Sequence, residues 1–130
     1  RDLVDLEGKN GRVITVFGCG GNKDRTKRPV MGKIAVSLSD YALITSDNPR
    51  YEDHFVIIDE ITAGTNGFKN YEVIEDRESA IRRGIEISRE GDIVLICGKG
   101  HETYQEVHGV RKHFDDMEMA VKYSNNAGRQ

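Results

Sequence analysis

The sequence has 130 residues, of which 37% are hydrophobic and 32% charged, and this size and composition fit one domain. Its 19 Lys and Arg residues stand against 22 Asp and Glu residues, and the resulting net charge of −3 argues against a general nucleic-acid-binding protein. No apolar run approaches the ~20 residues of a membrane-spanning helix, and the N-terminus lacks the apolar core of a signal peptide. We therefore expect a cytoplasmic protein that binds neither membrane nor nucleic acid, and we expect a monomer.

The first half of the chain predicts an alternation of strands and helices. Residues 12–19 form a β-branched apolar run that ends in glycines, which is typical of a buried strand. Pro29 fits the first turn of a helix. The apolar face of that helix consists of Val30, Met31, Ile34, Ala35 and Leu38. A second strand over residues 41–45 precedes a helix that stops at Gly64. One side of this helix carries Ile57, Ile58 and Ile61.

The second half continues the alternation. A third strand over residues 71–74 leads to a helix that Asp76 caps and that ends at Gly91. The inner stripe of this helix consists of Ala80, Ile81, Gly84, Ile85 and Ile87. Residues 92–97 form a fourth buried strand. Alternating strands and helices predict an α/β fold, a Rossmann-like doubly wound layer structure with a mostly parallel sheet.

The C-terminal region predicts a β-hairpin and a last helix. The hairpin strands are residues 104–108 and 111–114, and we expect the hairpin to add an antiparallel edge to the sheet. Asp115 and Glu118 have the spacing of an acidic capping box. The helix that follows carries Met117, Ala120 and Val121, and we expect residues 124–130 to be a loose tail.

Three charged or glycine-rich loops follow predicted strands, at residues 18–28, 46–50 and 98–102. Ligands of open α/β sheets bind outside the carboxyl ends of the strands. Because parallel strands bring these ends to one edge, we expect the three loops to converge there.

The first loop allows two interpretations. Its backbone amides beside a helix start favour an anion site, whereas a tight turn with a solvated basic face has the same composition. Gly18 and Gly20 match the first two glycines of GxGxxG, but Lys23 stands where the third is needed. The phosphate-binding pattern GxxxxGK(S/T) occurs nowhere in the sequence, so a small nucleotide-binding protein is disfavoured.

The other two loops add charges of both signs. Arg50 can grip a carboxylate with two parallel hydrogen bonds, although an ordinary Asp-Asn-Pro turn with Arg50 in water remains the alternative. Arg50 and Lys23 suit a carboxylate, whereas Glu102 and Asp47 suit an ammonium. A pocket with both signs fits a zwitterion, and therefore an amino acid. Neither the histidine spacing nor the two cysteines, Cys19 and Cys97, indicate a metal site, and the cysteines are interpreted as buried structural thiols.

Four motifs follow one another at residues 16–21, 27–32, 45–50 and 98–105, with the sequences VFGCGG, KRPVMG, TSDNPR and GKGHETYQ. Together they closely resemble the ATP-dependent Mur ligases, in particular the members that add 2,6-diaminopimelate. The resemblance runs from about residue 11 to about residue 121. It implies a three-domain enzyme whose last domain is this chain, as a single C-terminal domain over residues 1–130. The charged start without an initiator Met fits a piece of a longer protein.

The resemblance implies a reaction in peptidoglycan precursor synthesis. Meso-diaminopimelate is joined to the D-glutamate of UDP-N-acetylmuramoyl-L-alanyl-D-glutamate, with release of ADP and phosphate. ATP and Mg²⁺ are bound mainly by the missing central domain, so this fragment is expected to hold no cofactor, metal or catalytic residue and to be inactive alone. A stand-alone amino-acid-binding module without catalysis remains the alternative.

The resemblance also assigns site residues. The segment Asp47-Asn48-Pro49-Arg50 corresponds to the diaminopimelate recognition motif, in which Arg50 and Asn48 hold the carboxylate at the far end of the ligand. Gly98, by its backbone, and Glu102 face the same end, and Glu102 takes its ammonium.

Two positions depart from the family pattern. His54 replaces a common proline, which we expect to have a minor effect. The family usually has Arg where this chain has Lys23, and Lys keeps the charge but loses the planar fork. Two alternatives follow, because either Lys23 still contacts a carboxylate or Arg25 substitutes for it.

Overall fold

The computed structural model describes residues 11–19, 25–47, 53–97, 104–107 and 110–127. The predicted alternation of strands and helices is confirmed. The strands are β1 (Val13–Phe17), β2 (Tyr41–Ile44), β3 (Tyr71–Val73), β4 (Ile93–Cys97), β5 (Tyr104–Val107) and β6 (Val110–His113). The helical segments are η1 (Arg25–Lys27), α2 (Arg28–Leu38), α3 (His54–Thr62), α4 (Arg77–Ile87) and α5 (Asp116–Ala127).

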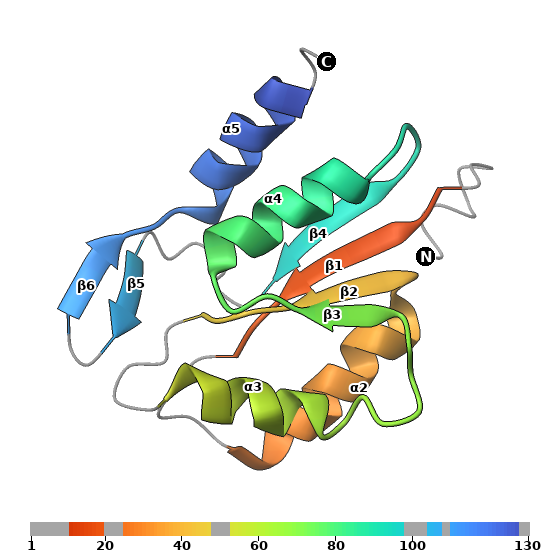
Figure 1. Ribbon diagram of the computed structural model, residues 1–130, viewed down its shortest axis with the longest axis vertical. Helices are drawn as coiled ribbons and strands as arrows, with labels where there is room; N and C mark the ends of the chain where they lie inside the picture. Colours follow the sequence, from red (N-terminus) through yellow and green to blue (C-terminus); the bar gives the residue numbers. More distant parts are fainter. Residues whose placement is uncertain (1–10, 20–24, 48–52, 98–103, 108–109, 128–130) are drawn as a thin grey trace.

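Four of these strands form one parallel sheet in the order β3-β2-β1-β4. Helices α2 and α3 cover one face of the sheet, whereas α4 covers the other face and α5 packs beside α4 (Figure 1). This arrangement follows from right-handed crossovers, because the chain moves outward from β1 to β3 and then returns past β1 to β4. Among the helices of the described ranges, none is long and apolar enough to cross a bilayer.

The core lies on both faces of the central strands. All five residues of β1 are buried, as expected for a strand with a helical layer on each side. The α3 face predicted from the sequence is confirmed, because Ile57, Ile58 and Ile61 are all buried. In α4 the predicted stripe is buried at Ala80, Ile81 and Gly84, and Asp76 caps the helix by accepting a hydrogen bond from the Ser79 amide at 3.0 Å.

The apolar face predicted for α2 is only partly covered. Ala35 packs on the core, but Val30, Ile34 and Leu38 are each more than half exposed, and the fully buried positions include Gly32 and Val36. A Cβ at Gly32 would lie 2.2 Å from the Ile61 carbonyl oxygen, so the missing side chain lets α2 lie directly against α3. Backbone contact between the two helices therefore brings α2 close to α3 and leaves part of its apolar face uncovered.

One predicted helix end is shifted. Helix α3 ends at Thr62 with Ala63 as its C-cap, so Gly64 directly follows the cap as the prediction requires, but α4 ends at Ile87, well before Gly91. Gly91 instead lies in the turn that leads to β4, with a φ of +92° that favours glycine.

The predicted hairpin forms, but the expectation that it extends the sheet is wrong. Strands β5 and β6 pair with each other in a separate two-stranded sheet. Neither strand pairs with the parallel sheet among the described residues, and the hairpin leads into α5 on the α4 side (Figure 1). Its pairing is therefore local.

The last helix also differs in detail from its prediction. Asp115 accepts a hydrogen bond from the Met117 amide at 2.8 Å, as a cap does, but Glu118 lies 2.5 Å from the His113 ring instead of closing a capping box. Met117 and Val121 are exposed, and Met119 packs on the core. The helix runs to Ala127, so the first four residues of the predicted tail are helical, and residues 128–130 lie outside the described ranges.

Candidate functional site

The carboxyl ends of three neighbouring strands meet at one edge of the sheet. In the strand register, Phe17 of β1 pairs with Ile44 of β2 on one side and with Cys97 of β4 on the other. The loops predicted to converge therefore start side by side. Of the predicted site residues, only Asp47 is described. The others lie outside the described residues, namely Lys23, Asn48, Pro49, Arg50, Gly98 and Glu102.

The segments after β1 and β2 lie in direct backbone contact. A Cβ at Gly18 would be 2.6 Å from the Thr45 carbonyl oxygen and 3.2 Å from the Asp47 amide nitrogen. The Thr45 amide donates a hydrogen bond to the Phe17 carbonyl at 2.9 Å, and Asp47 is only 4% exposed. Glycine at position 18 is thus required by this close approach.

We expect Gly18→Ala to lower the free energy of unfolding by about 1–3 kcal/mol, because the added methyl group overpacks a backbone contact that cannot rotate away. Urea unfolding of wild type and variant measures the loss. Gly84→Ala is the matched control, since the three atoms nearest to a Cβ there belong to the side chains of Val16, Leu43 and Val94, which can adjust, and not to the backbone. Equal losses at both positions would contradict the close approach at Gly18.

A buried guanidinium lies beneath two of the strand ends. Arg77, the first residue of α4, is 0% exposed. Its Nη1 donates to the Ser46 carbonyl at 3.1 Å and its Nη2 to the Cys97 carbonyl at 3.2 Å. Its Nε and Nη2 also donate to the two oxygens of Asp116, at 2.8 and 2.7 Å. Sequence reasoning missed this residue, because its partners are 20, 31 and 39 positions away.

Arg25, the alternative to Lys23, already has an acidic partner. Its guanidinium lies 2.7 Å from Glu60 Oε2, while the buried Arg28 donates to Glu60 Oε1 at 2.6 Å. The hydrogen bonds from Arg25 and then from Arg28 lower the pKa of Glu60. This carboxylate therefore stays ionised and ties the start of α2 to α3.

The prediction of two buried thiols is confirmed for one of the cysteines. Cys19 is buried and Cys97 is partly buried. Burial raises the pKa of the Cys97 thiol, and the nearby Arg77 offsets only part of that effect. A thiol that stays protonated at neutral pH is a poor nucleophile.

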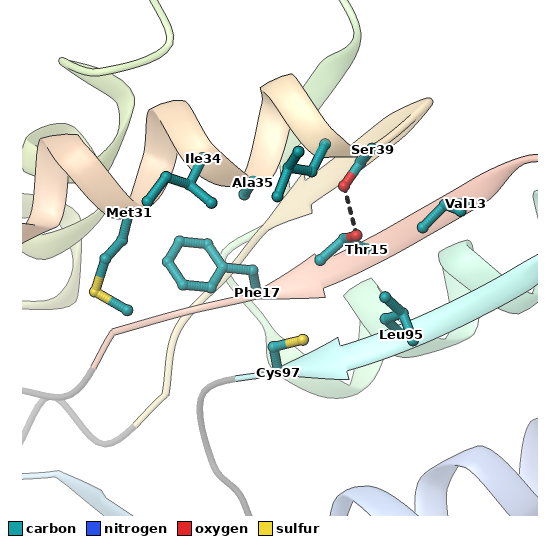
Figure 2. Close-up of a pocket in the computed structure, with 10 residues that line it drawn as sticks. Val13, Thr15, Phe17, Met31, Ile34, Ala35, Ser39, Leu95 and Cys97 are labelled. Carbon is teal, nitrogen blue, oxygen red and sulfur yellow. Dashed lines mark hydrogen bonds between the residues drawn. The ribbon is translucent and has the colours of Figure 1, made fainter. Parts of the chain in front are cut away.

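An apolar groove lies between α2 and strands β1 and β4 (Figure 2). It encloses about 400 Å³ and is lined mainly by Val13, Phe17, Met31, Ile34, Leu38 and Leu95. Figure 2 shows its two hydroxyl groups, on Thr15 and Ser39, bonded to each other at 2.6 Å. Such a lining lacks the charges that a zwitterion needs, so the candidate site is the strand edge and not this groove.

Within the described ranges, no three His, Cys, Asp or Glu side chains gather as metal ligands. The sequence also lacks the GxxxxGK(S/T) loop that cradles phosphates.

Comparison with known proteins gives the family. A model described as "Mur ligase, glutamate ligase domain" matches residues 2–100. The chain belongs to the Mur ligase family. The family resemblance of the four motifs is thereby confirmed.

The similar Mur ligases reported below all carry 2,6-diaminopimelate in their names. A UDP-N-acetylmuramoyl-L-alanyl-D-glutamate–2,6-diaminopimelate ligase 2 of Clostridium acetobutylicum is 54% identical over 118 residues, covering 90% of this chain and 24% of the relative. The corresponding ligase of Clostridium botulinum is 51% identical, over 84% of this chain and 22% of the relative. A solved structure of a ligase with this name superposes with a TM-score of 0.87 and 38% identity, over 99% of this chain and 27% of that one. The chain thus spans about a quarter of the length of these Mur ligases.

Proposed function

We propose that this chain is the C-terminal, amino-acid-recognising domain of a Mur ligase that adds meso-diaminopimelate to UDP-N-acetylmuramoyl-L-alanyl-D-glutamate. The observation that carries the proposal is the register of the strand ends, which starts three charged or glycine-rich segments side by side. Relatives about 50% identical carry the name of this ligase. Their greater length leaves room for the other domains that we propose.

In this proposal the strand edge binds the far end of diaminopimelate. Arg50 and Asn48 hold its carboxylate, while the Gly98 backbone and Glu102 hold its ammonium end. Glu102 is the better ammonium partner, because Asp47 is only 4% exposed and suits a role within the turn that carries Asn48 and Arg50. A fork of two charged hydrogen bonds from arginine fits a carboxylate closely.

The first loop contributes a further cation. We propose Lys23 as the carboxylate partner rather than Arg25, since Arg25 is bound to Glu60. A lysine ammonium acts there as a point charge without the geometric selectivity of a guanidinium.

The domain's own contribution is to fix the amino acid. Holding both charges at the far end leaves the reacting amine in a defined position, which lowers the entropic part of the barrier to amide formation. ATP supplies the activation of the D-glutamate carboxylate in this reaction class. We assign its binding, and that of Mg²⁺, to the remainder of the enzyme. ATP and a UDP-linked substrate fit a cytoplasmic enzyme.

A stand-alone amino-acid-binding module is the alternative function. This alternative predicts the same amino-acid site at the strand edge, but it predicts no ATP-hydrolysing domain elsewhere in the protein. A GxxxxGK(S/T) loop upstream in the same reading frame favours the ligase, and its absence favours the module.

The test is Arg50→Ala in the full-length ligase that contains this chain. We expect the KM for meso-diaminopimelate to rise about 10- to 100-fold, because a charged hydrogen-bond partner is lost. The KM for ATP should stay unchanged. Steady-state release of phosphate, with each substrate varied in turn, measures both values.

Arg82→Ala is the control, since the Arg82 side chain is 62% exposed and pairs only with Glu86 on the same helix among the ion pairs described. It should leave both KM values unchanged. An Arg50→Ala enzyme with wild-type KM for diaminopimelate would refute the assignment of this edge.

A further inference from the structure

Arg77 connects three parts of the chain at the carboxyl edge of the sheet. Its guanidinium bonds the Ser46 carbonyl after β2, the Cys97 carbonyl at the end of β4 and the carboxylate of Asp116 at the start of α5. In Figure 1 the carboxyl end of β4 and the start of α5 lie near the first turn of α4, where Arg77 is the first residue. One rigid planar group therefore sets the separation of two backbone segments that do not follow each other in sequence.

The Ser46 and Cys97 carbonyls lie close in sequence to the proposed ligand-binding segments. Ser46 lies two residues before Asn48 and four before Arg50, and Cys97 immediately precedes Gly98. Both carbonyls thus lie within a few residues of the segments that carry the proposed carboxylate and ammonium contacts. A change in the separation of Ser46 and Cys97 would therefore alter how both segments meet one ligand.

Only arginine suits this role. The guanidinium presents donors in a fixed fork, so it can bond two carbonyls and a carboxylate at once. A lysine in its place would keep the charge beside Asp116, but its single ammonium on a flexible stem would not fix both carbonyls.

We infer that Arg77 is a positioning residue for amino-acid binding, through which the segments after β2 and β4 are held at the separation that the ligand requires. This inference rests on the proposed function. In the proposed role, Arg77 does not contact the substrate. It acts only through its hydrogen bonds to the Ser46 and Cys97 carbonyls. Asp116 takes part by holding the guanidinium in its buried orientation.

A purely structural ion pair is the competing explanation. In that case, loss of Arg77 would lower stability without affecting one substrate more than another. The two explanations differ in kinetics, because a positioning residue alters the KM for the amino acid selectively, while loss of folded protein lowers the maximal rate for all substrates alike.

The first variant is Arg77→Lys in the full-length ligase, assayed at a temperature where circular dichroism finds it folded. We expect the KM for meso-diaminopimelate to rise on the order of 10- to 100-fold, the loss typical of a small misplacement of binding groups. The KM values for ATP and for the UDP-linked substrate should stay within about twofold of wild type. Arg12→Lys is the matched control, because Arg12 also bonds an aspartate and a backbone carbonyl, those of Asp92 and Ile87, but at the opposite edge of the sheet.

A second variant separates stability from positioning. In Arg77→Met combined with Asp116→Leu, both charges are replaced by apolar side chains of similar size, a change that is often neutral or stabilising for a buried pair. We expect this double variant to lose less stability than Asp116→Ala, since no buried charge is left without a partner, and still to show the raised KM for diaminopimelate, because the bonds to both carbonyls are gone.

The outcomes are distinct. A wild-type KM for diaminopimelate in the folded double variant, or equal increases for all three substrates, would overturn the inference. If Arg50→Ala raises this KM and the Arg77 variants do not, only the positioning role fails. If Arg50→Ala also leaves it unchanged, the proposed function fails and the inference fails with it.

Discussion

A full-length ligase containing this chain is expected to use meso-diaminopimelate and to leave L-lysine almost unused. Lysine has no carboxylate at its far end, so Arg50 would be desolvated without a partner on closure of the site. Sites built for polar contacts reject ligands that lack them by about 10⁴- to 10⁵-fold, and we expect kcat/KM to differ on that scale. Phosphate release with each amino acid, at the same concentration of the UDP-linked substrate, measures the ratio.

The Arg50→Ala enzyme provides the internal control for this selectivity. Because lysine makes no bond to Arg50, the kcat/KM for lysine should not fall in the variant. The kcat/KM for diaminopimelate should fall, so the ratio of the two kcat/KM values should become smaller than in the wild-type enzyme. Equal turnover of the two amino acids by the wild-type enzyme would contradict the proposed specificity.

Replacing Asp116 by alanine is expected to destabilise the 130-residue chain by about 3–5 kcal/mol, because it leaves a buried cation without its counter-charge. The cation is Arg77, which is 0% exposed. The carbonyls of Ser46 and Cys97 remain as acceptors, but neither carries a formal charge. The shift of the urea unfolding midpoint, multiplied by the slope of the transition, gives the loss.

Glu86→Ala tests whether burial of the arginine partner is the cause of the large stability loss expected for Asp116→Ala. Its partner Arg82 is exposed and stays hydrated when Glu86 is removed, so this variant should lose only about 0.3–0.5 kcal/mol. Comparable losses of unfolding free energy in Asp116→Ala and Glu86→Ala would mean that the buried charge of Arg77 does not need Asp116 as its counter-charge.

Local sequence patterns predicted most of the secondary structure. The β-branched runs of β1 and β4 have few alternatives to a buried strand, and the isoleucines of α3 share one side of a helix whatever the helix contacts. Alternation of strands and helices then predicted the parallel sheet through the handedness of crossovers. Family motifs at residues 45–50 and 98–105 named the segments at its carboxyl edge.

The buried side of α2 was not predictable in this way. Its strongest apolar stripe, with Ile34 and Leu38, is largely exposed, while Gly32 is buried against the Ile61 carbonyl of α3. Periodicity ranks faces by hydrophobicity, but here the available space between two backbones decided the packing. The hairpin is a similar case, because local sequence predicts the pairing of β5 with β6, whereas pairing with the parallel sheet depends on contacts between segments far apart in the sequence.

The sequence by itself determined the identity and order of the elements, the family, and the set of charges available to a ligand, because each of these depends on neighbouring residues or on motif content. Only the tertiary structure decided how the strand ends are fixed. Gly18 lies against Thr45, and Arg77 bonds Asp116 from 39 positions away. Such pairs leave no mark in local sequence, since they arise only when distant segments are packed into one core.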